Sequence, residues 1–417
     1  MSIHQSSHTV LLERFANHLA HEKYCQAIAE RYLVVAAKFL QYLRNRSIPF
    51  DVVEPVHVSR YLDGELAHFH RKHGHAPASI GGWRASHTSG IDNFLKLSKG
   101  DWPPVDHTRG LPNAMAQIMG EYVQWLRTAR GLAPDTVTGL ADECVRFLAW
   151  YSDQKNAESL EKMVVGDIDE YLFYRFPSLR RVSRKDVSSR LRSFMRFVHF
   201  TGRHIRDFTS CVLAPRIYAD EAIPSALRPN EILAILNTTR KDHSPKGLRD
   251  YAILMLLATY GLRAGEITHL RLEDIDWHGD KFLVRHTKTN SQTMLPLMPA
   301  VGEALLAYLR RGRPATDFRE IFIRSRAPYQ CFGSGSSLYT PIRRRIEAAG
   351  VKPKGKSGPH TFRHARAVTL LRTGLSPKII GDILGHRSTA STRPYLKLAV
   401  DDLRAVALEI PGRRYQS

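Results

Sequence analysis

One segment of the chain places a histidine and an arginine at the start of an expected helix. In GPHTFRHARA, Pro359 favours a helix start, so His360 and Arg363, three residues apart, share a face of the first turn. A helix N-terminus offers unpaired N–H groups and partial positive charge, and an arginine adds a planar fork that fits phosphate oxygens. This segment therefore predicts an anion site suited to phosphate.

A second arginine lies at an expected break between two helices. Arg263 follows Gly261, a residue typical of a helix C-cap. A guanidinium at such a position is costly to bury without an anionic partner. That partner could be a substrate, but a salt bridge to Glu266 or Asp274 explains the arginine at least as well.

A lysine is expected at the tip of a β-hairpin. Residues 281–288 (KFLVRHTK) and 293–297 (TMLPL) favour two strands on either side of a polar turn. From that tip Lys288 could reach a bound molecule. Taken alone, it is more often a solvated lysine that protects an edge strand.

A histidine and a tyrosine complete the series. His386 and Tyr395 lie nine residues apart in ILGHRSTASTRPYLKL. A tyrosine, with an ordinary pKa of about 10, needs a base and cationic neighbours to act as a nucleophile at neutral pH. Taken alone, the tyrosine is more often a packing residue and the histidine a satisfied surface or core residue.

The spacing of the histidines and cysteines does not predict a metal site. His360 and His364 resemble the zinc motif HExxH, but Thr361 stands where that motif needs glutamate, and no third ligand is apparent. The cysteines are far apart and predict neither a zinc site nor a disulfide framework; they are Cys25, Cys144, Cys211 and Cys331. We expect no metal and no other cofactor.

Taken together, and in their order along the chain, these four segments resemble the tyrosine recombinase (phage integrase) family. The matching words are YGLRAGE, GPHTFRHARA, LGHRST and STRPY, within a catalytic domain that covers about residues 230–409. Residues 118–203 resemble the family's helical core-binding domain, especially in RGLAPDT and DVSSRLRSFMRFVHFTG.

The resemblance implies which residues would hold and attack a DNA phosphate. Tyr395 would be the nucleophile, leaving a 3′-phosphotyrosine and a free 5′-hydroxyl. Arg263 and Arg363 would clamp the non-bridging oxygens, and Glu266 would orient the first arginine. Fixed cations of this kind stabilise the charge that phosphoryl transfer builds on the equatorial oxygens.

The resemblance also implies the residues that move protons. Lys288 would be the general acid for the leaving 5′-oxygen, His360 the base that handles the tyrosine proton, and His386 a hydrogen-bond donor to the phosphate. Two positions depart from the family pattern, because Pro394 restricts the backbone before the nucleophile and Lys397 stands where many relatives have histidine. Tyr415 is a rival nucleophile, but it lies in a polar tail at the wrong spacing.

The composition favours a polyanionic partner. The formal net charge is +21, and each lysine or arginine that neutralises a phosphate releases counterions. A solvated basic face is the alternative. The candidates for phosphate contacts are Arg180, Arg181, Arg184, Lys185, Arg190 and Arg192, with Lys354 and Lys356 in the loop KPKGK.

The elements that must position these residues fall into a helical half and a mixed half. The fold class we predict is mainly α with a small antiparallel β-sheet: helical DNA-clamp domains followed by a mixed α+β catalytic domain. Linkers rich in proline at 99–112 and 206–229 divide it into an N-terminal helical domain (1–100), a core-binding domain (112–205) and a catalytic domain (225–417).

The helical half indicates an internal duplication. KFLQYL at 38–43 matches RFLAWY at 146–151, and VSRYL at 58–62 matches IDEYL at 168–172. A nearly constant offset with the same order of elements is typical of a repeated module, here of four helices. Chance similarity between two small helical bundles is the alternative.

The resemblance implies a site-specific DNA recombinase or integrase of a mobile genetic element. It would act on double-stranded DNA carrying specific sites, as a homo-tetramer, without metal or ATP; the chain has no GxxxxGK[ST] phosphate loop. Residues 401–410 are a candidate helix for contact with a neighbouring subunit. Alternatives are a type IB topoisomerase-like or telomere-resolvase activity on the same site, and a non-catalytic DNA-binding protein, which the intact set of six residues disfavours.

The apolar segments are too short for a membrane protein. The longest apolar run, residues 251–260, falls well short of the roughly 20 residues that span a bilayer. The first residues, MSIHQSSHTVLLERF, lack the apolar core of a signal peptide. We expect a cytoplasmic, nucleoid-associated protein without a membrane partner.

Overall fold

The computed structural model describes most of the helical and mixed regions. Its described residues are 3–100, 102–103, 110–217, 226–286, 291–353, 355 and 357–385. Tertiary contacts divide the chain into two compact units, Lys99–Glu221 and a unit of Met1–Ser98 with Ala222–Ser417. The division into three domains therefore stays a prediction. Among the described helices, none is long and apolar enough to cross a membrane.

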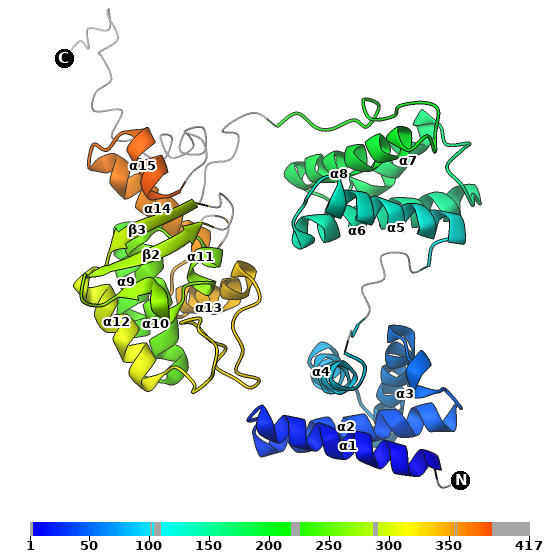
Figure 1. Ribbon diagram of the computed structural model, residues 1–417, viewed down its shortest axis with the longest axis horizontal. Coiled ribbons are helices and arrows are strands. Elements are labelled where there is room, and N and C mark those ends of the chain that lie inside the picture. Colours follow the sequence, from blue (N-terminus) through cyan, green and yellow to red (C-terminus); the bar gives the residue numbers. More distant parts are fainter. Residues whose placement is uncertain are drawn as a thin grey trace, which may run out of the picture. The chain divides into compact units, whose positions relative to one another are not determined.

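The predicted fold class, mainly α with a small antiparallel sheet, is confirmed (Figure 1). Eight α-helices of the described residues make up two groups of four in the first half of the chain, with a short 3-10 helix at Phe50–Val52 in the first group. The first group is α1 (Ile3–His21), α2 (Gln26–Asn45), α3 (Pro55–His73) and α4 (Ile80–Lys99). The second group is α5 (Asn113–Thr128), α6 (Pro134–Lys155), α7 (Val165–Arg175) and α8 (Arg181–Phe200).

The two groups contain an equivalent pair of aromatic rings. Phe39 of α2 meets Tyr61 of α3 edge-on, with ring centroids 5.4 Å apart and planes at 69°. Phe147 of α6 meets Tyr171 of α7 in the same way, at 5.1 Å and 78°. These rings occupy the matched positions of the two sequence repeats, and all four are buried. The shared geometry supports the internal duplication.

The C-terminal part is built around one buried helix. α10 (Pro245–Tyr260) packs against α9 (Pro229–Arg240), α12 (Pro299–Arg311), α13 (Tyr339–Ala348) and α14 (Pro359–Arg372). Because it is covered on several sides, its apolar run has no exposed stripe; the fully buried residues are Ala252, Ile253, Leu254, Leu256 and Leu257. The remaining helices are the short α11 (Ala264–Thr268) and α15 (Pro377–Ile383).

The predicted hairpin is confirmed as the paired strands β2 and β3 (Figure 1), which belong to a three-stranded antiparallel sheet of order β1-β2-β3. The strands are β1 (Ile275–Asp276), β2 (Lys281–His286) and β3 (Ser291–Pro296). Phe282 and Val284 of β2 face the core, as the period of two requires. The last pair of the ladder joins His286 to Ser291, and residues 287–290 lie outside the described residues.

Three charged residues form a network between α10 and α13. Asp250 of α10 is fully buried and accepts from Arg249 Nη2 at 2.8 Å through one carboxylate oxygen. The other oxygen accepts from Arg345 Nε of α13, also at 2.8 Å. The sequence pattern did not predict this network, because a single charged residue beside an apolar run shows no periodicity from which its partners could be inferred.

We expect Asp250→Ala to destabilise this part of the chain by about 3–5 kcal/mol, because it leaves the buried Arg249 guanidinium without its counter-charge. The measurement is native-state hydrogen exchange of the α10 amides, which reports the free energy of local opening. Arg343→Ala is the control, since it breaks only the exposed Arg343–Glu347 pair on α13. Equal protection of α10 in both variants would contradict the assigned role of Asp250.

Candidate active site

Arg263 occupies the junction between two helices, as predicted. Gly261, whose φ of 67° is left-handed, caps the C-terminus of α10, and α11 begins at Ala264. The backbone N–H of Arg263 donates to Glu266 Oε2 at 2.7 Å, and its Nη1 donates to Glu266 Oε1 at 2.7 Å. Of the two carboxylates suggested by the sequence, Glu266 is therefore the partner.

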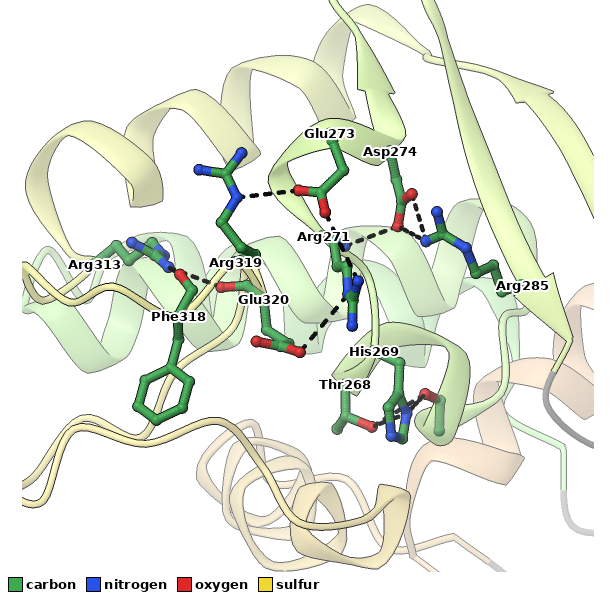
Figure 2. Close-up of polar contacts among 11 residues, drawn as sticks. Thr268, His269, Arg271, Glu273, Asp274, Arg285, Arg313, Phe318, Arg319 and Glu320 are labelled. Atoms are coloured by element: carbon green, nitrogen blue, oxygen red, sulfur yellow. Dashed lines mark hydrogen bonds and ion pairs between the residues drawn. The ribbon is translucent and has the colours of Figure 1, made fainter.

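Asp274, the other suggested carboxylate, bonds to Arg285 instead (Figure 2). Arg285 lies on β2, so this ion pair ties the strand to the turn that precedes β1. Glu266 thus binds Arg263, whereas Asp274 holds the sheet through Arg285.

Arg263 and Arg363 converge on two consecutive carbonyl groups. Arg263 Nη2 donates to the Gly385 carbonyl at 2.7 Å. Arg363 of α14 donates from Nη2 to the Leu384 carbonyl, and from Nη1 to the Gly261 carbonyl at 2.9 Å. Residues far apart in the sequence thus place two guanidinium groups at one spot, directly after α15. Arg263 keeps 19% of its side-chain surface exposed, whereas Arg363 is only 4% exposed.

Gly261 makes this approach possible. A Cβ at this position would lie 3.0 Å from Leu384 Cδ2 and 3.1 Å from Arg366 Cβ. A side chain there would therefore push α14 and the end of α15 away from the α10–α11 junction. The glycine serves both as a left-handed helix cap and as the contact surface between these elements.

His286 is a residue of the site that sequence reasoning missed. It is 2% exposed, and its Nδ1 lies 2.7 Å from Glu266 Oε1. Its Nε2 lies 3.0 Å from Thr293 Oγ1 on β3. The available signal was the alternation of β2, which places His286 on the same buried face as Phe282 and Val284. A histidine on an apolar face indicates a polar partner inside the core.

α14 begins at Pro359 as predicted, and its first two turns carry four ionisable groups. His360 is exposed and Arg363 is buried. The rings of His360 and His364 are stacked with centroids 6.3 Å apart. Burial, with the nearby His360 and Arg363, lowers the pKa of His364 to about 4. Burial also lowers the pKa of the Arg366 guanidinium, whose Nε has no hydrogen-bond partner among the described residues.

The remaining predicted residues of the site and of the KPKGK loop lie outside the described residues; they are Lys288, His386, Tyr395, Lys354 and Lys356. Pro394 and the segment 401–410 lie there too. Two of these positions lie close in sequence to described residues. β2 ends at His286, two residues before Lys288, and the described residues after α15 end at Gly385, one residue before His386. The structure therefore brings together Arg263, Arg363 and Glu266, and adds His286.

A separate polar network fixes the chain between α11 and the sheet (Figure 2). The backbone N–H of Leu272 donates to the Arg319 carbonyl at 2.9 Å. Side chains reinforce this pairing, with Arg319 Nε 3.3 Å from Glu273 Oε2 and Arg271 Nε 3.8 Å from Glu320 Oε1. These ion pairs are partly exposed, so each contributes little alone, and the backbone bond sets the geometry.

The basic residues at the start of α8 and along it differ in exposure. Arg180, Arg181 and Lys185 are exposed at the start of the helix. Arg184 Nε donates to the Leu179 carbonyl at 2.9 Å, and Arg192 donates twice to the Val212 carbonyl, at 3.0 and 2.7 Å. Arg190 is half-buried. The first three are thus the most exposed of the predicted phosphate contacts on this helix.

Known proteins match the chain in sequence. The model of the phage integrase family matches residues 225–401. The putative integrase/recombinase y4rA of Sinorhizobium fredii is 31% identical over 400 residues, which cover 95% of this chain and 93% of that protein. Another protein of that organism, the putative integrase/recombinase y4gC, is 60% identical over 190 residues, 46% of this chain and 97% of that protein.

Solved structures match the chain in fold. The XerH site-specific recombinase, in a post-cleavage complex with palindromic difH DNA, aligns with a TM-score of 0.55 at 17% identity, covering 69% of this chain and 83% of that chain. A lambda integrase tetramer bound to a Holliday junction aligns with a TM-score of 0.52 at 18% identity, covering 77% and 87%. At these identities the likeness shows a shared fold.

The low pKa of His364 predicts a pH-dependent stability. The pKa is about 4 in the folded chain against an ordinary value of 6.5, so the unfolded chain binds the proton more readily between these values. The contribution of neutral His364 to the free energy of unfolding is therefore complete above pH 6.5, and it is lost as the pH falls towards 4. We expect urea unfolding of the wild type to show this loss and His364→Gln to lack it. Identical pH dependence in both proteins would refute the assignment.

Proposed function

Because the chain belongs to the phage integrase family of tyrosine recombinases, we propose that it cuts and rejoins DNA through a covalent bond between Tyr395 and a 3′-phosphate. The chain is a tyrosine-type site-specific DNA recombinase, an enzyme whose partner is DNA. We propose, in addition, the identity of the nucleophile, the roles of its neighbours, the oligomeric state and the biological context.

The convergence of Arg263 and Arg363 is the observation that carries the proposal. Both guanidinium groups point at the Leu384–Gly385 backbone, directly before His386 in the sequence. Glu266 holds Arg263 through two hydrogen bonds, so little reorganisation is needed when a phosphate arrives. Preorganised cations are worth most where charge develops in the transition state, here on the non-bridging oxygens.

In the proposed cleavage step, Tyr395 Oη forms a bond to phosphorus and the bond from phosphorus to the 5′-oxygen breaks. His360 takes the phenolic proton and Lys288 gives a proton to the departing 5′-oxygen. The exposed position of His360 in the first turn of α14 suits a group that exchanges its proton with solvent between steps. Religation is the same sequence reversed, with a 5′-hydroxyl as the nucleophile.

The proposed reaction needs no ATP, because the phosphotyrosine bond retains the energy of the broken phosphodiester. The charge that divalent metals neutralise in many phosphoryl transferases would be met here by the two arginines and Lys288. We therefore propose strand cleavage in the presence of a metal chelator.

A homo-tetramer on paired sites and a mobile-element context complete the proposal. The relatives named integrase/recombinase and the lambda integrase tetramer on a Holliday junction support it. Exchange between two duplexes requires four cleavages, which four copies of one nucleophile supply. Relaxation of site-free plasmids would instead favour the topoisomerase-like alternative.

The nucleophile can be tested with nicked suicide substrates built from the DNA that flanks the gene, in buffer containing a chelator. We expect wild-type protein to form a covalent protein–DNA adduct on a denaturing gel. Tyr395→Phe should form none, because the variant lacks the attacking oxygen. Tyr415→Phe is the matched control and should behave as wild type. An adduct with Tyr395→Phe, or its loss with Tyr415→Phe, would overturn the assignment.

The phosphate contacts of α8 can be tested by salt dependence. We expect the triple variant Arg180→Ala, Arg181→Ala, Lys185→Ala to weaken duplex binding. The slope of log affinity against log salt should fall in magnitude by about 0.9 for each lost phosphate contact. Lys162→Ala, an exposed lysine outside α8, serves as the control. An unchanged slope in the triple variant would assign these residues to a solvated face.

A further inference from the structure

We infer that His286 is a positioning residue for the proposed general acid: it holds the β2–β3 hairpin, and through it Lys288, in register with the arginine clamp. The inference rests on the proposed function of Lys288. Its own support lies in the contacts of His286, which join three parts of the site: α11, β3 and the segment after α15.

His286 is bonded through both ring nitrogens. Nδ1 lies 2.7 Å from Glu266 Oε1, the same oxygen that accepts from Arg263 Nη1 at 2.7 Å. Nε2 lies 3.0 Å from Thr293 Oγ1. Since a carboxylate only accepts, Nδ1 carries the proton towards Glu266. The contact with Glu266 is thereby defined chemically as well as sterically.

The ring of His286 also lies against Gly385. Gly385 has a left-handed φ of 63°, and a Cβ on it would lie 2.7 Å from His286 Cε1. The carbonyl of the same glycine accepts from Arg263. One imidazole thus contacts the carboxylate that orients the first arginine and the glycine that this arginine binds.

The place of His286 on β2 links this contact to the acid. His286 and Ser291 form the last pair of the β2–β3 ladder among the described residues, and Lys288 follows His286 by two residues. A slip of one residue in strand pairing would turn every side chain of the strand to the opposite face. The bond to Glu266 fixes the register at the end of the described strand nearest Lys288.

A purely structural histidine would behave differently. Its loss would lower stability and slow every step alike, whatever the leaving group. A positioning residue for the acid affects only steps in which the leaving oxygen needs a proton, because misplacement of an acid by about 1 Å can cost about 100-fold in rate. A substrate with sulfur in place of the bridging 5′-oxygen removes that need, since a thiol has a much lower pKa than an alcohol.

The test compares single-turnover cleavage of oxygen and 5′-bridging sulfur substrates by the full-length protein. Lys288→Ala tests the proposed function, and we expect about 10²–10⁴-fold slower cleavage of the oxygen substrate with recovery on sulfur. For His286→Phe, which keeps an aromatic ring without hydrogen bonds, we expect a loss of about tenfold or more on oxygen and recovery on sulfur. Duplex affinity should stay at the wild-type value.

Two further variants keep the inference falsifiable if His286→Phe does not fold. His286→Asn retains a donor near the position of Nδ1 but loses the contact with Thr293, so it should cleave the oxygen substrate with a milder defect than His286→Phe, and sulfur should relieve that defect. Thr293→Val removes the partner of Nε2 and should show a milder defect that sulfur also relieves. A defect that persists on sulfur in these variants would mean that His286 acts through Arg263, and would overturn the inference.

The outcomes separate the two proposals. If sulfur does not relieve Lys288→Ala, the proposed role of Lys288 fails, and the inference fails with it. If sulfur relieves Lys288→Ala while the His286 and Thr293 variants cleave both substrates like wild type, the inference alone fails. Recovery on sulfur in both sets supports both.

Discussion

The Glu266 carboxylate is the point on which the site depends. It is nearly fully buried and accepts from the Arg263 backbone, the Arg263 guanidinium and His286. A charge removed from water at this cost is tolerated only where several donors surround it. One donor lies at the start of α11, the second is the side chain of an arginine of the site, and the third lies at the end of a strand. The requirement to satisfy one carboxylate therefore assembles elements that the chain supplies separately.

The rest of the C-terminal fold brings those elements within reach. α10 is buried on several sides and is capped by Gly261, whose carbonyl accepts from Arg363. The close contact of Gly261 with Leu384 brings the end of α15 beside this junction, where Arg263 and Arg363 meet two successive carbonyls. Apolar packing thus sets the distances, and hydrogen bonds from the arginines set the directions.

Much of this could be predicted from the sequence, and the reasons for the rest are physical. Gly261, Pro359 and the alternation in β2 signal a cap, a helix start and a strand, because each depends on local backbone preference. The bond of Arg263 to Glu266 was one of two open choices, since spacing alone does not say which carboxylate an arginine turns towards. His286 and the network around Asp250 depend on contacts between distant segments, which no local pattern encodes. Lys288, His386 and Tyr395 stay predictions.

The matched ring pairs, Phe39 with Tyr61 and Phe147 with Tyr171, have a consequence for how such a chain acquires new binding properties. The two bundles keep one internal frame, yet their fourth helices begin differently: α8 opens with the basic RVSRK and α4 with IGGWR. The predicted duplication would give the chain a second exterior that can change freely, because the stability of each bundle rests on the rings inside. Such a surface, already folded, is one on which a different specificity can develop without disturbing the first.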